Sequence, residues 1–177
     1  MKDLRTWQPF TQRIPTAISA SLFVVILGFW VVWGYQAYSQ YYHRVPLDLP
    51  GTSLVRLPEQ DVENYRSIVQ NINENCDNFV SMPGLNSFYF WTQKDPPTTL
   101  NAGAWMSLLD EQQQRSVVRN IESIPRLCAV YDPELTQYGA QNRDLAKLPL
   151  SSFILKDFRT VSTVGNFRFM VRNESNP

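Results

Sequence analysis

The sequence predicts an α/β protein in which one N-terminal transmembrane helix precedes a small three-layer α/β domain with a mostly parallel sheet and a C-terminal antiparallel hairpin. Three observations predict this fold: an uncharged apolar stretch near the N-terminus, short apolar runs that alternate with helical periodicities, and a Gly-Asn pair between two strand-like segments. The predicted parts are a cytoplasmic segment (1–13), the membrane helix (14–42), a linker (43–52), the exoplasmic domain (53–173) and a tail (174–177).

The membrane helix is predicted because no formal charge occurs from Ile14 to Tyr42. Its most apolar part is Ala17–Trp33, and with Tyr35 and Ala37 added it spans about 30 Å of hydrocarbon as a helix. A buried helix of a soluble protein is one alternative, but it should show polar residues on one face, and none appear for several turns. A cleaved signal peptide is the stronger alternative, but its apolar region is normally shorter, and Ala-Tyr-Ser before Gln40 is a poor cleavage site. Aromatic residues that favour the headgroup zone crowd the C-terminal end of the stretch: Trp30, Trp33, Tyr35, Tyr38, Tyr41 and Tyr42.

The charges that flank this helix predict its orientation. After the span, Arg44 and Asp48 cancel. Before the span, three basic residues outnumber one acid: Lys2, Arg5 and Arg13 against Asp3. Positive charge is retained on the cytoplasmic side, so we expect a single-pass protein of the cell membrane with a cytoplasmic N-terminus and an exoplasmic C-terminal domain.

The first half of the outer domain alternates strand and helix after a Pro/Gly linker. Residues 53–57 read as a first short strand, and residues 59–76 place apolar side chains at helical spacing with acids in the first turn. The run Asn78–Met82 is typical of a buried strand, because it is apolar and ends at Pro83-Gly84.

The second half continues the alternation. Residues 110–124 predict a helix in which Asp110 and Gln113 form a capping box, and the apolar run 126–132 predicts the next buried strand. A long polar loop is expected from Pro133, and a short helix from Pro149. The order strand–helix–strand–helix–strand implies parallel pairing with right-handed crossovers. The Gly165-Asn166 turn then adds an antiparallel hairpin.

Composition and charge exclude several functions. Lys plus Arg and Asp plus Glu balance at 16 each, without the clustered cations that nucleic acids require, so no nucleic-acid partner is predicted. The only histidine, His43, lies at the membrane edge and leaves nucleophilic catalysis without a base. No metal-ligand spacing or glycine-rich phosphate loop occurs. We therefore expect no catalytic residue, metal or cofactor in the outer domain.

The two cysteines leave two interpretations open. Cys76 ends the first predicted helix and Cys128 lies early in a predicted strand. If the strands 78–82 and 127–131 are neighbours, both cysteines lie near the same end of the sheet. An exoplasmic location permits a disulfide between them, and two small buried thiols are the alternative.

One loop is unusually aromatic for a chain with so few catalytic groups. Phe88, Tyr89, Phe90 and Trp91 are consecutive, so they cannot all face one core, and at least one is expected to be exposed or covered by another surface. Three interpretations fit the loop: packing between elements, a contact with the membrane or a partner, or direct contact with a carbohydrate. Residues of similar chemistry flank it: Asn86, Asn101 and Trp105.

Several segments resemble the C-terminal exoplasmic region of bacterial membrane-embedded glycosyltransferases that use polyprenyl-phosphate sugars. They are MPGLNSFYFWT, PPTTLNAGAW, the Gln-rich helix, PRLCAVY and the closing FILKDFRTVSTVGNFRFMVRN. The resemblance covers roughly residues 14–173. It implies that the aromatic loop lies above the membrane cavity and helps to cover a lipid-linked or acceptor sugar. The ligand-binding candidates it implies are Asn86, Trp91, Asn101 and Trp105.

The chain departs from that family at the reaction centre. The family's catalytic carboxylate is expected in an exoplasmic loop after the first of many membrane helices, and this chain has one span and no such loop. We therefore expect an accessory domain or a fragment, inactive by itself, whose partners are the membrane and a multispanning glycosyltransferase or a lipid-linked sugar. The alternative is a bitopic membrane scaffold whose outer domain binds a protein partner through the aromatic loop.

Overall fold

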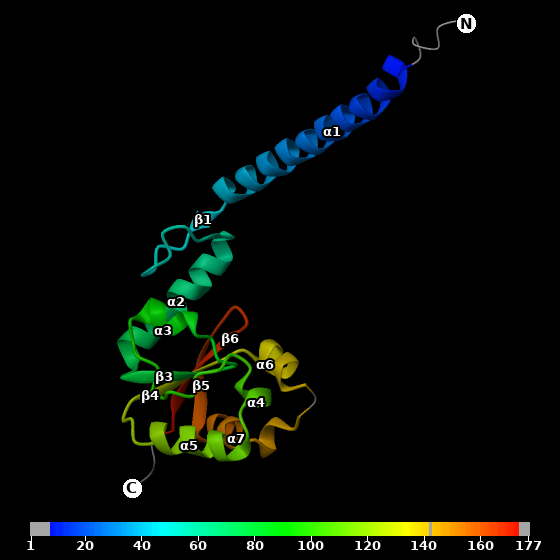
Figure 1. Cartoon of the computed structure of the whole chain (residues 1–177). Coiled ribbons are helices and arrows are strands. Elements are labelled where there is room, and N and C mark those ends of the chain that lie inside the picture. The colour runs from blue at the N-terminus through cyan, green and yellow to red at the C-terminus, as the bar shows by residue number, and fades with distance from the viewer. Residues whose placement is uncertain (1–7, 142, 174–177) are drawn as a thin grey trace, which may run out of the picture. The chain divides into compact units, whose positions relative to one another are not determined.

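The computed structural model describes residues 8–141 and 143–173 (Figure 1). The chain divides into two compact units, Met1–Arg44 and Val45–Pro177. Residues 1–7 of the predicted cytoplasmic segment and all of the predicted tail lie outside the described residues. The second unit begins at Val45, within the predicted linker.

The first unit is one long helix, α1 (Gln8–His43). Its segment Ile18–His43 contains an 18-residue window with a mean hydropathy of 2.0, and the side chains of that window are exposed. The helix is long and apolar enough to cross a membrane. It begins before the predicted span because no helix-ending signal separates Gln8 from Ile14.

The prediction for the first strand of the outer domain, residues 53–57, is wrong both in its length and in the strand with which it pairs. Only Arg56–Leu57 forms a strand, β2, and it pairs antiparallel with β1 (Val45–Pro46) in a separate two-stranded sheet. Two features shorten it. The Thr52 hydroxyl donates to the Leu49 carbonyl at 2.7 Å and holds a turn just before it, and Pro58 follows it directly.

The main sheet has four strands in the order β3-β4-β6-β5. Their bounds are β3 (Asn78–Met82), β4 (Leu127–Tyr131), β5 (Phe158–Val164) and β6 (Phe167–Arg172). Only β3 and β4 pair in parallel, while β4 with β6 and β5 with β6 are antiparallel. The expected mostly parallel sheet is therefore wrong, because β2 does not join it and β6 inserts beside β4.

Side-chain caps mark the starts of α5 and α6. At the start of α5, Asp110 and Gln113 form the predicted capping box, with Gln113 N donating to Asp110 Oδ1 at 2.8 Å. The expected loop after Asp132 is instead partly helical, because Asp132 caps it and Pro133 occupies its first turn. The bounds are α2 (Glu59–Asn75), α3 (Ser87–Thr92), α4 (Trp105–Leu108), α5 (Glu111–Ile121), α6 (Pro133–Ala140), η1 (Leu145–Lys147) and α7 (Pro149–Asp157).

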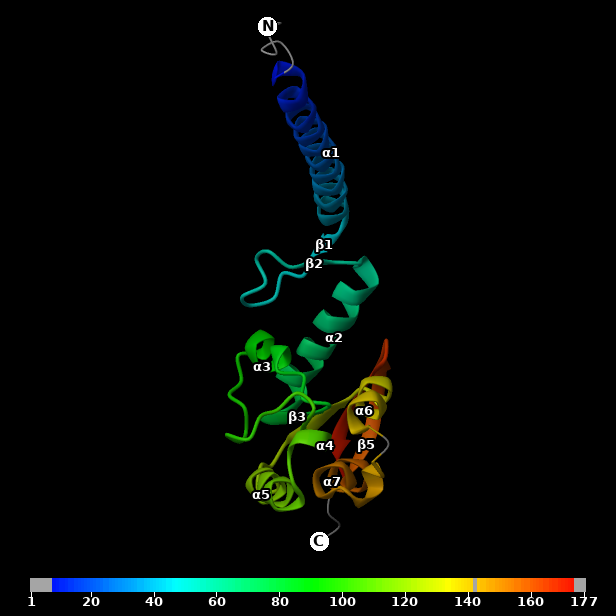
Figure 2. The ribbon, with the colours of Figure 1, turned by 45° about the vertical axis from the view of Figure 1, so that its right-hand side comes forward.

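Two apolar clusters lie on the two faces of the sheet, and helices cover both faces (Figure 2). Alternate residues of each strand point to opposite faces, so neighbours such as Phe79 and Val80 join different clusters. On one face α4, α5 and α7 cover Val80, Met82, Leu127, Ala129 and Met170. On the other face α2 and α3 cover Phe79, Val130, Phe167 and Phe169.

A disulfide joins Cys76, the residue directly after α2, to Cys128 in β4. The next residue, Asp77, is bonded to Arg126, which precedes β4. Asp77 N donates to the Arg126 carbonyl at 2.9 Å, and the side chains of the two residues form an ion pair at 2.9 Å. The end of α2 is therefore fixed to the sheet at one point.

Candidate functional site

The aromatic loop folds as the short helix α3, which sorts its consecutive rings onto different faces. Phe88, Tyr89 and Thr92 are buried on one face, whereas Phe90 points away from it and is 63% exposed. Each helical residue turns about 100° from the last, so one of four consecutive rings must face outward. The helix ends at Thr92, and the next residue, Gln93, has a φ of 55°.

The inward rings of α3 are structural. Phe88 is 2% exposed and meets the rings of Tyr65, Trp91 and Phe167 edge to face. Tyr89 stacks on Phe79 with 4.3 Å between ring centroids, and its hydroxyl donates to the Phe79 carbonyl at 3.0 Å. Burial raises the pKa of Tyr89, because the ionised phenol would lose its hydration.

Phe90 is held against a tight turn although it is exposed. Gly51 has a φ of +72°, and a Cβ at this position would lie 1.8 Å from Phe90 Cε1. The absence of a side chain at Gly51 therefore lets the ring lie on the backbone. Together the turn and α3 form an open groove, here called the aromatic groove. It is lined by Pro50, Gly51, Asn86, Tyr89, Phe90, Gln93, Lys94, Asp95 and Pro96.

Hydrogen bonds fasten the rim of the aromatic groove to the end of α2 and to the start of β3. Lys94 Nζ donates to the Cys76 carbonyl at 3.0 Å, and Asn78 Nδ2 donates to the Asp95 carbonyl at 3.1 Å. Asn86 and Gln93 are exposed, and their side-chain amides bond to no other group in the described part of the chain. The groove therefore offers one apolar ring and two uncommitted amides on an anchored rim.

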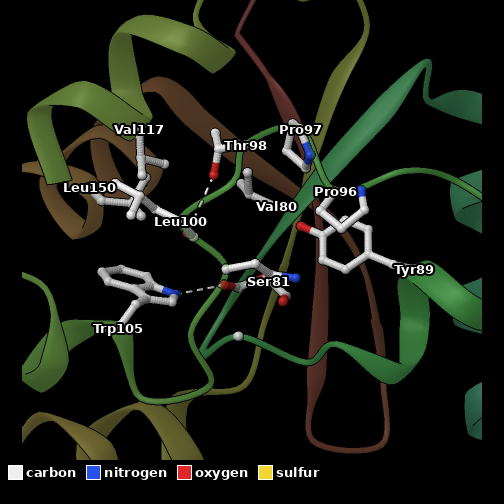
Figure 3. Close-up of a pocket in the computed structure, with 12 residues that line it drawn as sticks. Val80, Ser81, Tyr89, Pro96, Pro97, Thr98, Leu100, Trp105, Val117 and Leu150 are labelled. Atoms are coloured by element: carbon white, nitrogen blue, oxygen red, sulfur yellow. Dashed lines mark hydrogen bonds between the residues drawn. The ribbon is translucent and has the colours of Figure 1, made fainter. Parts of the chain in front are cut away.

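A second, much smaller cavity lies behind the loop (Figure 3). Trp105 and Asn101 are among its lining residues, and its volume is about 30 Å³, which is room for about two water molecules. Trp105 is 4% exposed, and its Nε1 donates to the Ser81 carbonyl at 3.0 Å. This cavity is too small for a sugar, so Trp105 is a core residue.

The structure does not bring the four candidate residues together. Asn86 lines the aromatic groove, whereas Asn101 and Trp105 line the small cavity. Trp91 is half-buried and packs its ring on Tyr65 with 5.3 Å between centroids.

Of the nine residues that line the groove, only Asn86 was among the four candidates, and the residues not predicted include Phe90, Gln93 and Lys94. The run of four aromatics indicated that one ring faces outward. Identifying Phe90 as that ring required the phase of the helix, which the sequence does not reveal.

The aromatic groove presents an exposed aromatic ring and side-chain amides. Across residues 8–141 and 143–173, no group of three or more His, Cys, Asp or Glu side chains could hold a metal ion. Both cysteines are in the disulfide, and His43 lies in α1 with its Nδ1 2.7 Å from the Ser39 carbonyl. No protein-family model, curated protein or solved structure matches this chain. The fold and the site define an α/β domain, preceded by an apolar helix, with an open aromatic groove.

Proposed function

We propose that this chain is a membrane-anchored, exoplasmic accessory domain of a glycosyltransferase that uses polyprenyl-phosphate sugars, and that its aromatic groove contacts the sugar. The observation that carries the proposal is the exposed Phe90 ring, held on the Gly51 turn beside the amides of Asn86 and Gln93. The resemblance of the surrounding sequence to the outer region of such enzymes supports the same ligand class.

The groove chemistry suits a pyranose. An aromatic face covers the apolar C–H face of a sugar ring, while side-chain amides donate to and accept from its hydroxyl groups. The Gly51 turn holds the Phe90 ring before a ligand arrives, so binding costs little side-chain entropy. The groove is open, which lets it cover part of a sugar while the remainder contacts another surface.

The proposed topology places α1 in the membrane, the N-terminus in the cytoplasm and the α/β domain outside. The length and apolarity of α1 support anchoring. The Cys76–Cys128 disulfide supports the exoplasmic side, because disulfides persist in oxidising compartments and are rare in the cytosol. Protease added to intact cells should then digest the domain, and alkaline carbonate should leave the full chain in the membrane. Release by carbonate contradicts the anchor.

No catalytic role is proposed for any residue of this chain. The reacting carboxylate belongs, in this proposal, to the multispanning transferase unit, either in the same polypeptide or in a separate protein. The outer domain then covers the bound sugar rather than reacting with it.

The test uses the full chain in lipid nanodiscs with polyprenyl phosphates that carry glucose, mannose or N-acetylglucosamine. Saturation-transfer NMR, read at the sugar protons, should show contact with the sugar of at least one of these lipids. Phe90→Ala should weaken that contact about fivefold, because an aromatic contact contributes about 1 kcal/mol. The matched control is Leu108→Ala, which removes an exposed apolar side chain outside the groove.

Two results contradict the proposal. In one, no sugar lipid gives saturation transfer, or Phe90→Ala behaves as the wild type does. In the other, a photo-crosslinker at Phe90 captures a protein and no glycolipid in living cells. The second result instead supports a bitopic scaffold that uses the same loop to bind a protein.

A further inference from the structure

A second groove lies where the parallel strands β3 and β4 end, and it shares no lining residue with the aromatic groove. Five segments contribute to it: α2, the residue after β4, α6, the β5–β6 turn and the first residue of β6. Of these, α6 and the turn can be followed in Figure 2. Its volume is about 540 Å³, which is in the range of small-molecule sites. This strand-end groove is lined by Asp61, Asn64, Tyr65, Asp132, Glu134, Leu135, Tyr138, Gly165, Asn166 and Phe167.

Aromatic side chains form the walls of the strand-end groove. Tyr138 is 87% exposed at its rim, and its hydroxyl has no partner among the described residues. Tyr65 lies deeper and packs on Phe167 with 5.7 Å between ring centroids. A Cβ at Gly165 would lie 2.5 Å from Asn64 Nδ2, so the turn accommodates the amide only because residue 165 has no side chain.

The charged residues that line the strand-end groove are all acidic. Three carboxylates line the groove, those of Asp61, Asp132 and Glu134, and its lining includes no lysine or arginine. None of the ion pairs formed within the described chain involves them. Asp132 is only 3% exposed and accepts a hydrogen bond from Leu135 N at 3.0 Å. The groove therefore has a field that attracts positive charge.

The negative charge of the strand-end groove also affects the pKa of Tyr65. This pKa is raised first by burial and then by the charges of Asp61 and Asp132, so both carboxylates lie close enough to disfavour a further negative charge. These carboxylates do not converge closely enough to hold a metal ion, at least among the residues that the structure describes. A larger ligand, with its charge near several oxygens and against tyrosine faces, satisfies both observations.

From these contacts we infer that the strand-end groove binds an organic cation, a primary ammonium or guanidinium group, between Tyr65, Tyr138 and the three carboxylates. The tyrosine faces attract such a cation through their negative π surfaces, and the carboxylates and Asn166 accept its N–H donors. An amino sugar and a lysine or arginine side chain of a protein supply the same group. The inference is independent of the proposed sugar contact, because it concerns another groove.

The glycines of this chain allow both grooves to be observed in one spectrum. The chain has seven glycines, of which Gly165 lines the strand-end groove and Gly51 the aromatic groove. Full-length protein labelled with ¹⁵N-glycine in micelles is titrated with glucosamine against N-acetylglucosamine, and with acetyl-lysine-amide against its ε-acetylated form. In each pair, acetylation replaces the charged amine by a neutral amide.

The amine forms should shift the Gly165 resonance, and the acetylated forms should bind at least about tenfold more weakly. A response to glucosamine alone identifies a sugar as the source, a response to the lysine compound alone identifies a protein, and responses to both show that the amine suffices. Equal responses to the charged and acetylated forms, or no Gly165 shift with either amine, overturn the inference. A Gly51 response to sugar lipids tests the proposed function separately.

Charge-neutral variants localise the site. Asp61→Asn and Glu134→Gln should each weaken the Gly165-detected affinity about threefold, as expected for loss of one partly exposed charge contact. Glu63→Gln is the matched control, because Glu63 lies on α2 but does not line the groove. Asp132 is left unchanged since it caps α6. Unshifted resonances of the other glycines show that each variant is folded, and wild-type affinity in both groove variants overturns the inference.

Discussion

The indole Nε1 of Trp105 donates a hydrogen bond to the backbone carbonyl of Ser81 at 3.0 Å. Ser81 lies in β3, and its own hydroxyl accepts a hydrogen bond from Leu85 N at 2.6 Å. The two bonds fasten both ends of the aromatic loop to the same residue of the sheet. The position of α3 is therefore set by buried contacts, which leaves its exposed ring available for recognition.

Trp105→Phe should lower the free energy of unfolding by about 1–3 kcal/mol, because the Ser81 carbonyl loses its buried donor. Chemical denaturation of the full chain in micelles measures the loss. Trp91→Phe is the comparison, because Trp91 is half-buried and no hydrogen bond from its indole is found among the described contacts. An equal loss in both variants would show that ring volume, rather than the hydrogen bond, dominates at Trp105.

Phe88 and Phe90 provide a matched pair two residues apart. Phe88→Ala should lower the free energy of unfolding by about 3–5 kcal/mol, since it removes a ring from a buried aromatic cluster. Phe90→Ala should change stability much less, because 63% of its surface is already exposed. Thermal unfolding of the two variants decides the matter. A large loss of stability in Phe90→Ala would assign that ring to packing instead of ligand contact.

Local features of this fold could be predicted from the sequence, and pairings between distant segments could not. The bounds of β3 and the capping box of α5 are confirmed, because an apolar run or a cap and its partner lie within a few residues. The insertion of β6 beside β4 depends on contacts across more than thirty residues.

The candidate site shows the same division. The aromatic run identified the loop, but the exposure of Phe90 depends on the phase of α3 and on Gly51, far away in sequence. Trp105 is of a residue type that binds sugars, and the sequence alone therefore makes it a candidate. In the structure it is buried and belongs to the core.

Alkaline pH should destabilise the outer domain through Tyr89. Its pKa is raised in the folded state, so the phenol stays protonated there while it ionises near pH 10 in the unfolded chain. The stability it contributes is thus present below pH 10 and decreases above it, by about 1.4 kcal/mol per pH unit. Tyr89→Phe should flatten this dependence and cost about 1 kcal/mol at pH 7, through loss of the bond to Phe79. Unfolding curves from pH 7 to 11 test both, and parallel curves would be inconsistent with a protonated Tyr89.

Removing the disulfide should destabilise the domain and loosen the groove. Cys76 and Cys128 are 52 residues apart, and closing a loop of that length stabilises a fold by about 4 kcal/mol. Because Lys94 bonds to the Cys76 carbonyl, the groove rim should lose order as well. A Cys76→Ala, Cys128→Ala variant should show a lower Tm and a shifted Gly51 resonance. A reducing agent should lower the Tm of the wild type and leave that of the variant unchanged.

Gly51→Ala tests whether the turn beneath Phe90 positions the ring. The change forces an alanine into a φ of +72°, which costs about 1–2 kcal/mol, and its Cβ would lie 1.8 Å from the ring of Phe90. The ring must therefore move off the turn, and sugar-lipid contact should weaken as much as in Phe90→Ala. Gly103→Ala is the control, because its Cβ would meet only the Gly84 carbonyl at 3.7 Å, an ordinary contact. If Gly51→Ala loses stability but keeps full contact with the sugar lipid, ligand recognition does not depend on the position of the Phe90 ring.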